Sequence, residues 1–433
     1  MKRLLIGLIG MGWAAAAEAQ DWPQWRGNLL NNVSPETDLP VRWTPTENVL
    51  WRVPLPGPAG SSPVVAANRV FVTSPDGDQI KLFCFSTAGE KRWERTIGQG
   101  NRTVREDEGN SASPSPATDG QHVWAMDTNG NLVCCTVDGD LVWTKALQDE
   151  FGAFDIQFGM TSTPVLFQDK LYLQLIHGSM QDRTPSKGLV ICLNAGDGSL
   201  AWRHVRETDG TAENKHSYAS PTIYQDGETA QLIIHGADYV TAHDLRDGHE
   251  LWRCGNLNPT ENYNPFLRFV ASPTWGDKLV IVPTAKRGPV VAIRPGPAGL
   301  ITENPDAIAW RIDQGTPDVP TPVLVDGLVY LCGENGTLTC LDAQNGDKVY
   351  LERTESDRYR ASPVAAGGHL YLTSRGGVVT VVKLGRTFDV VSRNEMQEPT
   401  TASPAIAGGR IYLRTFAALY AIGQPSTQTS VSQ

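Results

Sequence analysis

The connections that precede a recurring Ser/Thr-Pro dipeptide carry aromatic and charged side chains together. The candidate binding residues are Phe158, His216, Tyr218, Arg268, Asp318, Tyr359 and Arg360. Loops on a rigid scaffold are where binding residues concentrate, and convergent polar and aromatic groups suit a ligand or partner site. We therefore expect these side chains to form one binding surface, the alternative being an ordinary polar rim.

Catalytic motifs are absent from the sequence. The eight histidines show no close metal-ligand spacing, and there is no nucleophile elbow, phosphate loop or zinc signature. Acids such as Glu106, Asp107 and Asp155 occur in the same connections, but no motif places them together. The sequence thus predicts binding chemistry, with no catalytic, cofactor-binding or metal-binding residue assigned.

A repeated all-strand element must position those connections. Residues 321–353 contain four short apolar strands separated by Asp-Gly and Asn-Gly pairs, which accept the positive φ that two-residue hairpins need. Such stretches open with Ser/Thr-Pro at eight places, 41 to 57 residues apart. The dipeptides begin at Ser62, Ser115, Thr163, Ser220, Ser272, Thr321, Ser362 and Ser403. This period predicts an all-β fold, an eight-bladed β-propeller of four-stranded antiparallel blades.

The two ends of the repeat region complete one blade. Residues 48–55 read as a fourth strand without its first three, and the last repeat, ending at Gly423, has three strands. We expect the N-terminal strand to close the ring, because closure removes exposed sheet edges. The expected division is a signal peptide at 1–19, a leader packing on the propeller at 20–47, the propeller at 48–423 and a disordered tail at 424–433.

The junction between the third and fourth strands is the most repeated sequence. AHDLRDGHELW (242–252), CLNAGDGSLAW (192–202) and CLDAQNGDKVY (340–350) share a small residue, an Asp or Asn, a turn glycine and a final aromatic residue. The tryptophans at the aromatic position are Trp51, Trp93, Trp143, Trp202, Trp252 and Trp310. We expect each ring to pack between blades. The pattern resembles the tryptophan-docking motif of the quinoprotein alcohol dehydrogenase-like, or PQQ-repeat, propellers.

Four of the seven cysteines fill the small-residue position of this motif. They are Cys84, Cys134, Cys192 and Cys340. Because the position recurs in different blades and is filled by Ala242 in the fourth, we expect buried, reduced thiols. The alternative is a redox or disulfide role, since the adjacent Cys134 and Cys135 resemble the vicinal disulfide of PQQ dehydrogenases.

Within the PQQ-repeat propellers, the chain is most similar to the BamB outer-membrane-assembly group and to secreted proteins that begin with a DWPQWRG leader, here residues 21–27. The resemblance implies two function classes. The first is an exported, non-catalytic propeller that acts as a protein- or ligand-binding scaffold. The alternative is a PQQ- and calcium-dependent quinoprotein dehydrogenase. We favour the scaffold, because no motif gathers the oxygen ligands that Ca²⁺ needs.

The charge balance narrows the class of partner. The 433 residues include 47 Asp and Glu against 37 Lys and Arg, a net charge of −10, which disfavours nucleic acid and anionic membrane surfaces. Beyond the expected signal peptide, no segment is long and apolar enough to span a membrane. We expect a periplasmic or secreted monomer with a protein or glycan partner, no bound cofactor and no transmembrane segment.

Overall fold

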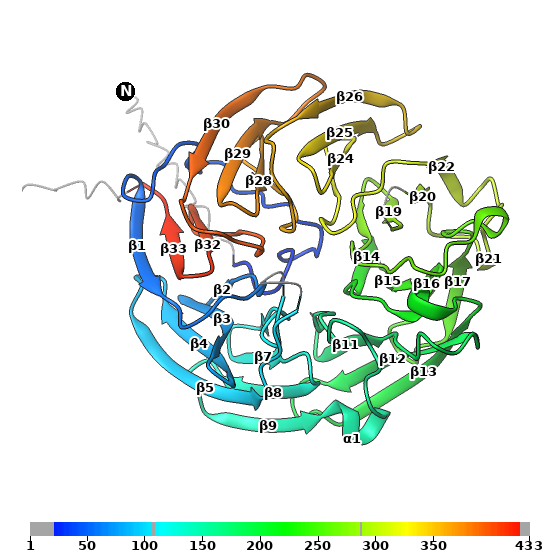
Figure 1. Ribbon diagram of the computed structural model, residues 1–433, viewed down its shortest axis with the longest axis horizontal. Helices are drawn as coiled ribbons and strands as arrows, with labels where there is room; N and C mark the ends of the chain where they lie inside the picture. The colour runs from blue at the N-terminus through cyan, green and yellow to red at the C-terminus, as the bar shows by residue number, and fades with distance from the viewer. Residues whose placement is uncertain (1–20, 105–108, 286–287, 425–433) are drawn as a thin grey trace, which may run out of the picture.

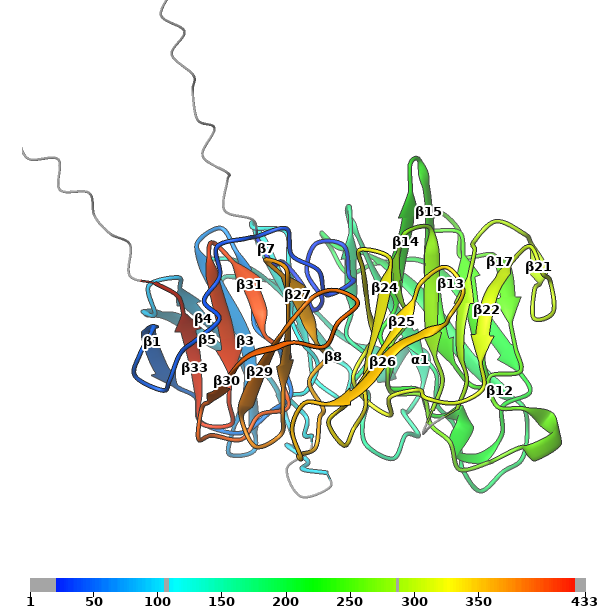
Figure 2. The same cartoon turned by 90° about the horizontal axis from the view of Figure 1, so that it is seen from above.

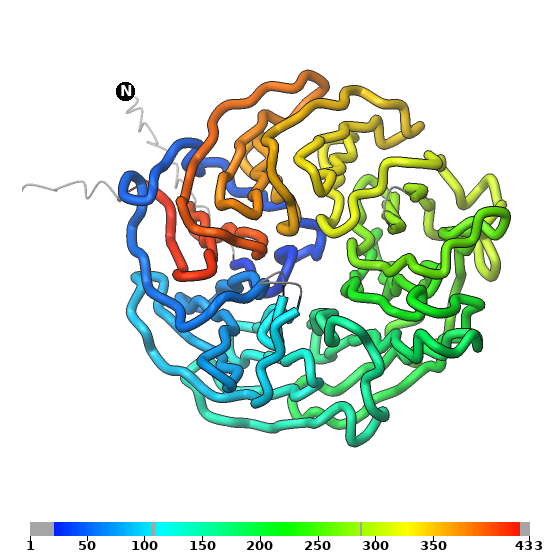
Figure 3. Tube along the Cα trace, viewed as in Figure 1, coloured from blue at the N-terminus to red at the C-terminus, as the bar shows by residue number. Residues whose placement is uncertain are grey.

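The computed structural model describes residues 21–104, 109–285 and 288–424. These residues form a ring of eight sheets around a common axis (Figure 1; Figure 3). Seven sheets have four strands, and the remaining one has a fifth short strand. The predicted eight-bladed propeller is confirmed. The expected signal peptide and all but the first residue of the expected tail lie outside the described residues.

The first four blades run consecutively along the chain, and their strands pair in sequence order. Blade 1 contains β2 (Val64–Ala66), β3 (Arg69–Asp76), β4 (Gln79–Ser86) and β5 (Lys91–Gln99). Blade 2 contains β6 (Ala117–Thr118), β7 (His122–Met126), β8 (Asn131–Thr136) and β9 (Leu141–Ala146). Blade 3 contains β10 (Val165–Phe167), β11 (Lys170–Leu175), β12 (Ser186–Asn194) and β13 (Leu200–Thr208). Blade 4 contains β14 (Thr222–Asp226), β15 (Thr229–Gly236), β16 (Tyr239–His243) and β17 (Glu250–Cys254).

The other four blades complete the ring. Blade 5 contains β18 (Thr274–Gly276), β19 (Leu279–Pro283), β20 (Val290–Ile293) and β22 (Ile308–Ile312). Blade 6 contains β23 (Val323–Val325), β24 (Leu328–Cys332), β25 (Thr337–Asp342) and β26 (Lys348–Arg353). Blade 7 contains β27 (Val364–Ala366), β28 (His369–Thr373), β29 (Val378–Lys383) and β30 (Val390–Glu395). Blade 8 contains β31 (Ala405–Ala407), β32 (Arg410–Arg414), β33 (Ala418–Ile422) and β1 (Val49–Pro54).

Blade 8 closes the ring in the way that the sequence predicts. Strand β1 pairs antiparallel with β33, with Val53 opposite Leu419 and Pro54 opposite Ala418. The first strand of the propeller and its last hairpin therefore share one sheet, so neither is left as an open edge.

Short additions occur in the connections between blades. They are the helix α1 (Leu147–Phe151), the 3-10 turns η1 (Ala212–Lys215) and η2 (Thr260–Asn262), and strand β21 (Gly299–Leu300). Strand β21 belongs to the insertion before β22, yet it pairs in parallel with β17 of the preceding blade. The insertion therefore covers the outer edge of blade 4.

The recurring Ser/Thr-Pro dipeptides form a closed ring of hydrogen bonds. In each blade the backbone N–H of the Ser or Thr donates to the hydroxyl oxygen of the equivalent residue in the next blade, over 2.9 to 3.3 Å. The ring closes where the Ser403 N–H donates to the Ser62 hydroxyl at 3.0 Å. These residues are buried, so each bond pairs a group that would otherwise be costly to leave unsatisfied.

Five of the expected docking tryptophans make the same contact with the next blade. Each indole N–H donates to a backbone carbonyl there, over 2.7 to 3.0 Å; the tryptophans are Trp51, Trp93, Trp143, Trp202 and Trp310. Each ring also lies against the turn glycine of that blade. Gly346 has φ +76°, and a Cβ built there would lie 2.8 Å from the Trp310 ring. The turn therefore requires glycine.

Trp252 is the exception among the six tryptophans. Its indole N–H donates to the side-chain oxygen of Gln231, within its own blade, at 2.9 Å. The insertion that contributes β21 pairs alongside it, with Trp252 opposite Gly299. Trp252 is fully buried, with 1% of its surface exposed. It therefore packs in the core, but its indole N–H bonds within its own blade and not to the turn of the next blade.

The cysteines at the small-residue position lie directly opposite the docking aromatics. Cys84, Cys134 and Cys192 pair across their strands with the corresponding tryptophans, and a β-bulge follows each pair. A small side chain there leaves room for the large ring beside it. All seven cysteines lie in the described part of the chain, and they are buried and form no disulfide.

The leader, residues 21–47, crosses the face of the ring at which the inner strands end (Figure 2). Trp22 and Val65 exchange two backbone hydrogen bonds of 2.8 Å. The buried guanidinium of Arg26 donates to the carbonyls of Pro221 at 2.7 Å and Pro273 at 2.6 Å. Further contacts join the leader to blades 2, 3, 7 and 8. One face is therefore covered, and the connections that enter the inner strands lie at the opposite face.

Candidate functional site

A cavity of about 200 Å³ lies among the connections that enter the inner strands, and we call it the mouth cavity. Its lining residues are Gly60, Val104, Gly109, Ser113, Phe158, Thr161, Tyr218, Arg268, Val270, Asp318, Val319, Arg360 and Thr401. Five of the seven predicted binding residues are among them. His216 and Tyr359 are not.

The lining follows a positional rule in the repeat. In all eight connections, the residue two positions before the Ser or Thr of the dipeptide lines the mouth cavity. In blade order these residues are Gly60, Ser113, Thr161, Tyr218, Val270, Val319, Arg360 and Thr401. Because the hydrogen-bonded ring holds every dipeptide in an equivalent place, the residues two positions earlier converge on the axis. Tyr218 and Arg360 are among the predicted binding residues, and the other six are not.

Arg268 and Phe158 form one side of the mouth cavity. The Nη1 atom of Arg268 lies 3.2 Å from Oε1 of Glu213 on η1, and its guanidinium carbon lies 5.4 Å from the Phe158 ring centroid. The Phe158 ring in turn packs on Tyr218 with centroids 5.8 Å apart. Arg268 is only 5% exposed. The guanidinium is therefore held in a fixed orientation by an ion pair and a cation–π contact.

The other charged groups of the mouth cavity come from the connections before blades 6 and 7. Asp318 contributes a half-buried carboxylate. Arg360 pairs with Glu334 through an Nη1 to Oε1 distance of 2.9 Å. The described lining therefore combines two guanidinium groups, one carboxylate, two aromatic rings and small hydroxyl residues. This set can bind hydrogen-bonding and apolar groups of a partner.

His216 is buried and does not line the mouth cavity. It is 1% exposed, its Nε2 lies 3.0 Å from the Gly178 carbonyl oxygen, and its ring meets Tyr218 edge-on. Burial lowers the pKa of His216. A neutral, buried imidazole with these contacts supports the Tyr218 ring and is not positioned to contact a ligand itself.

Tyr359 departs most from the prediction. Its side chain is fully buried in the core shared by blades 6 and 7, and its hydroxyl lies 3.1 Å from the Thr354 hydroxyl. A β-bridge with Ser374 makes this segment extended, and successive side chains of an extended chain point to opposite sides. Since Arg360 faces the mouth cavity, Tyr359 faces the core.

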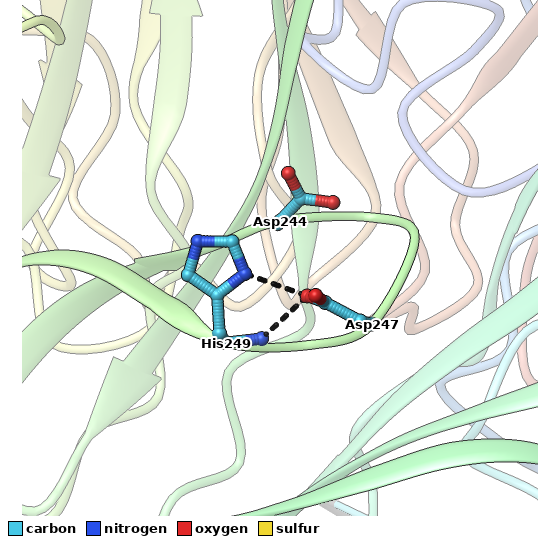
Figure 4. Close-up of side chains that lie close together, drawn as sticks. All are labelled: Asp244, Asp247 and His249. Atoms are coloured by element: carbon cyan, nitrogen blue, oxygen red, sulfur yellow. Dashed lines mark hydrogen bonds and ion pairs between the residues drawn. The ribbon is translucent and has the colours of Figure 1, made fainter.

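A second group of titratable side chains lies in the turn between β16 and β17 (Figure 4). The ligand atoms of Asp244, Asp247 and His249 lie within 4.8 Å of one another. The Asp247 carboxylate accepts bonds from the backbone and ring of His249, and the Asp244 carboxylate accepts three from Arg246. These contacts cap a turn of the repeat and need no metal ion.

Comparison with known proteins places the chain in a family. The family model for outer membrane protein assembly factor BamB matches residues 33–174 and 137–384. This chain belongs to that family. The finding confirms the resemblance to the PQQ-repeat propellers, although a search of curated proteins finds no match.

Solved structures with the same fold include both an outer membrane protein assembly factor and dehydrogenases. BamB from Moraxella catarrhalis is 13% identical with a TM-score of 0.62, over 87% of this chain and 98% of that chain. The quinohemoprotein alcohol dehydrogenase ADHIIG from Pseudomonas putida HK5 is 11% identical with a TM-score of 0.65, over 95% and 82%. A europium-containing methanol dehydrogenase is 10% identical with a TM-score of 0.53, over 92% and 90%. At these identities the likeness shows the fold alone.

A quinone and Ca²⁺ site at the mouth cavity would need a particular set of donors. Ca²⁺ takes about six to eight oxygen ligands, with carboxylates prominent among them. Asp318 is the one carboxylate among the described lining residues. Asp155 does not line the cavity, and Glu106 and Asp107 lie outside the described residues. The described residues therefore do not fit a calcium-dependent quinone site. The rings of Phe158 and Tyr218 also contact each other, which leaves no space for a quinone to stack between them.

Proposed function

We propose that this BamB-family chain is an exported, non-catalytic scaffold that binds a protein partner at the mouth cavity. Export is supported by the signal peptide that the sequence predicts at 1–19 and by the family's description as outer membrane protein assembly factors. No helix in the described part of the chain is long and apolar enough to cross a membrane.

The convergence of eight equivalent residues on one small cavity carries the proposal. The cavity measures about 200 Å³, below the roughly 300 to 1,000 Å³ of typical small-molecule sites. Its size suits one or two side chains of a partner. Tyr and Arg are enriched in the residues that dominate protein–protein binding energy, and Tyr218, Arg268 and Arg360 all line it.

The fixed orientation of these groups suits a preformed binding surface. Arg268 and Arg360 are each paired with a glutamate, and Tyr218 contacts both Phe158 and His216. No histidine, the commonest general acid or base in enzymes, occurs among the described lining residues. A rigid, preformed surface loses little side-chain entropy on association.

Site-specific photo-crosslinking tests the proposal. A photo-reactive amino acid replaces Val319, which is half-buried and lines the mouth cavity, or Leu29, which is exposed on the leader face. Both proteins are irradiated in the cell envelope of the source organism. We expect one defined protein adduct from position 319 and none of the same mass from position 29. Identical adduct patterns, or none from position 319, contradict the proposal.

Titration with PQQ and Ca²⁺ tests the enzymatic alternative. The purified protein is incubated with both, and quinone binding and dye-linked alcohol or sugar oxidation are followed together. We expect neither. Stoichiometric quinone binding with substrate-dependent dye reduction would establish the dehydrogenase instead.

A further inference from the structure

A second cavity, of about 750 Å³, lies where blades 3 and 4 meet the insertion that contains β21, and we call it the outer cavity. Its lining residues are Asp209, Thr211, Asp238, Tyr239, Gly255, Asn256, Asn258, Thr260, Glu261, Tyr263, Leu300, Thr302, Glu303 and Asn304. They come from the connections after β13 and β17, the β15–β16 turn and the insertion. It shares no lining residue with the mouth cavity, so the inference below does not depend on the proposed function.

The charged side chains that line the outer cavity are all acidic. Four carboxylates line it, from Asp209, Asp238, Glu261 and Glu303, and no lysine, arginine or histidine is among its described lining residues. None of the four carboxylates forms an ion pair with a basic side chain in the described ranges. The nearby Arg253 pairs with Glu250 through contacts of 2.5 and 2.7 Å, so its charge is already balanced.

Asp238 is built into the wall of the outer cavity. It lies in the Ala237–Asp238 turn between β15 and β16, and it is only 4% exposed. Its carboxylate accepts hydrogen bonds from Asn214 at 2.9 Å and from the Tyr263 hydroxyl at 2.8 Å. Burial raises the pKa of Asp238 to about 6, although these two hydrogen bonds oppose the rise. A cation in the cavity would favour its charged form.

The spacing of the carboxylates argues against a metal ion. A divalent cation needs several oxygen ligands converging on one point. Among the described residues, the group with metal-like spacing is Asp244, Asp247 and His249, which lies outside this cavity. No three of the four described carboxylates of the outer cavity therefore have the spacing of a metal site, and separate carboxylates suit a ligand with separate positive charges.

Four carboxylates favour a cationic ligand over a neutral sugar, and the Tyr239 ring offers no open face for stacking. A sugar ring would need an open aromatic face, but one face of Tyr239 lies so close to Gly255 that a Cβ there would be 2.5 Å from the ring. The guanidinium carbon of Arg253 also lies 5.5 Å from the Tyr239 centroid. The apolar parts that remain are the Tyr263 ring and the Leu300 side chain, which is 69% exposed.

We propose that the outer cavity binds a linear polyamine. Its ammonium groups would pair with Asp209, Glu261 and Glu303 around the wall, in charge-assisted hydrogen bonds. The methylene segments between the ammonium groups would pack on Tyr263 and Leu300. A polyamine meets both requirements of this cavity, separated positive charges and apolar spacers, in one flexible chain.

Calorimetric titration with spermidine at physiological ionic strength tests this assignment. The variants are Glu261→Gln/Glu303→Gln in the cavity and Asp38→Asn/Asp149→Asn as a control. All four positions are exposed, and both double variants change the net charge equally. Thermal unfolding of each variant checks that the fold is kept. We expect saturable 1:1 binding to the wild type and the control, and at least a tenfold weaker affinity for the cavity variant.

Two outcomes would overturn the assignment. Equal weakening in both double variants would mean that spermidine acts as a diffuse counterion of an acidic protein. No saturable heat with spermidine would mean that the cavity does not take a free polyamine. Crosslinking at Val319 reports on the mouth cavity alone, so the two proposals can fail separately.

Discussion

The contact between Trp310 and Gly346 gives the most quantitative test of how the blades are held together. Trp310 is 7% exposed, and its indole N–H donates to the Ala343 carbonyl of the next blade at 2.7 Å. A tryptophan buries about 150–250 Å², which at about 25 cal/mol/Å² corresponds to about 4 to 6 kcal/mol. Truncation of buried Trp to Ala costs about 3 to 5 kcal/mol. We therefore expect Trp310→Ala to lower the free energy of unfolding by about 4 kcal/mol.

A double-mutant cycle separates docking from ordinary burial. At Gly346 an alanine adopts an unfavourable positive φ, at a cost of about 1 to 2 kcal/mol, and its Cβ would lie 2.8 Å from the Trp310 ring, which adds about 1 to 3 kcal/mol of overpacking. Removing the ring removes only the second cost. Gly346→Ala should therefore be less destabilising in the Trp310→Ala background, with a coupling of at least about 1 kcal/mol.

Urea unfolding followed by circular dichroism measures all four corners of this cycle. Leu351→Ala is the control, because this side chain is 52% exposed on the outer strand β26, and exposed substitutions usually change stability by less than about 0.5 kcal/mol. Additive effects of the two substitutions would refute the docking contact. A Trp310→Ala effect no larger than that of the control would refute it as well.

Three further outcomes are expected. Ser272→Ala leaves the buried Ser220 N–H without its acceptor and should lower the free energy of unfolding in urea by about 1 to 3 kcal/mol. Ser272→Thr keeps a hydroxyl and is the control; equal stability of the two variants would contradict the hydrogen-bonded ring. Burial lowers the pKa of His243 from 6.5 to about 3, so the unfolded chain takes up the proton first and stability should fall as the pH drops below about 6.5. His243→Gln should make stability less dependent on pH in this range. An unchanged pH dependence would contradict the lowered pKa of His243. Burial raises the pKa of the Cys84 thiol to about 12, so Ellman's reagent at pH 8 should label the cysteines only after unfolding; rapid labelling of the native protein would contradict their burial.

The fold could be predicted from the sequence because its determinants recur. Each blade carries its own turn glycines and alternating strands, so the period alone indicated eight four-stranded sheets. The complementary ends at 48–55 and Gly423 indicated the closure that β1 and β33 form. The role of the Ser/Thr hydroxyls was not predicted, because each hydrogen bond joins residues of two different blades.

The candidate site was predicted less completely. Residue type within the connections correctly indicates Arg268 and Arg360 as lining residues, but it also indicates Tyr359, which is a core residue. The position two residues before each Ser/Thr-Pro dipeptide also indicates the small lining residues, such as Gly60 and Thr161. The outer cavity was not predicted, because the insertion that forms one wall pairs with the preceding blade, and its sequence does not indicate that partner.

The affinity of the partner recovered at position 319 is the decisive quantity for the proposed scaffold. It is measured by calorimetry with wild type, with Val319→Trp, which fills the mouth cavity, and with Leu29→Trp, which adds the same side chain on the leader face. We predict at least a tenfold loss of affinity for Val319→Trp and no change for Leu29→Trp. Unchanged affinity for Val319→Trp, in a variant that unfolds at the wild-type temperature, would contradict binding at the mouth cavity.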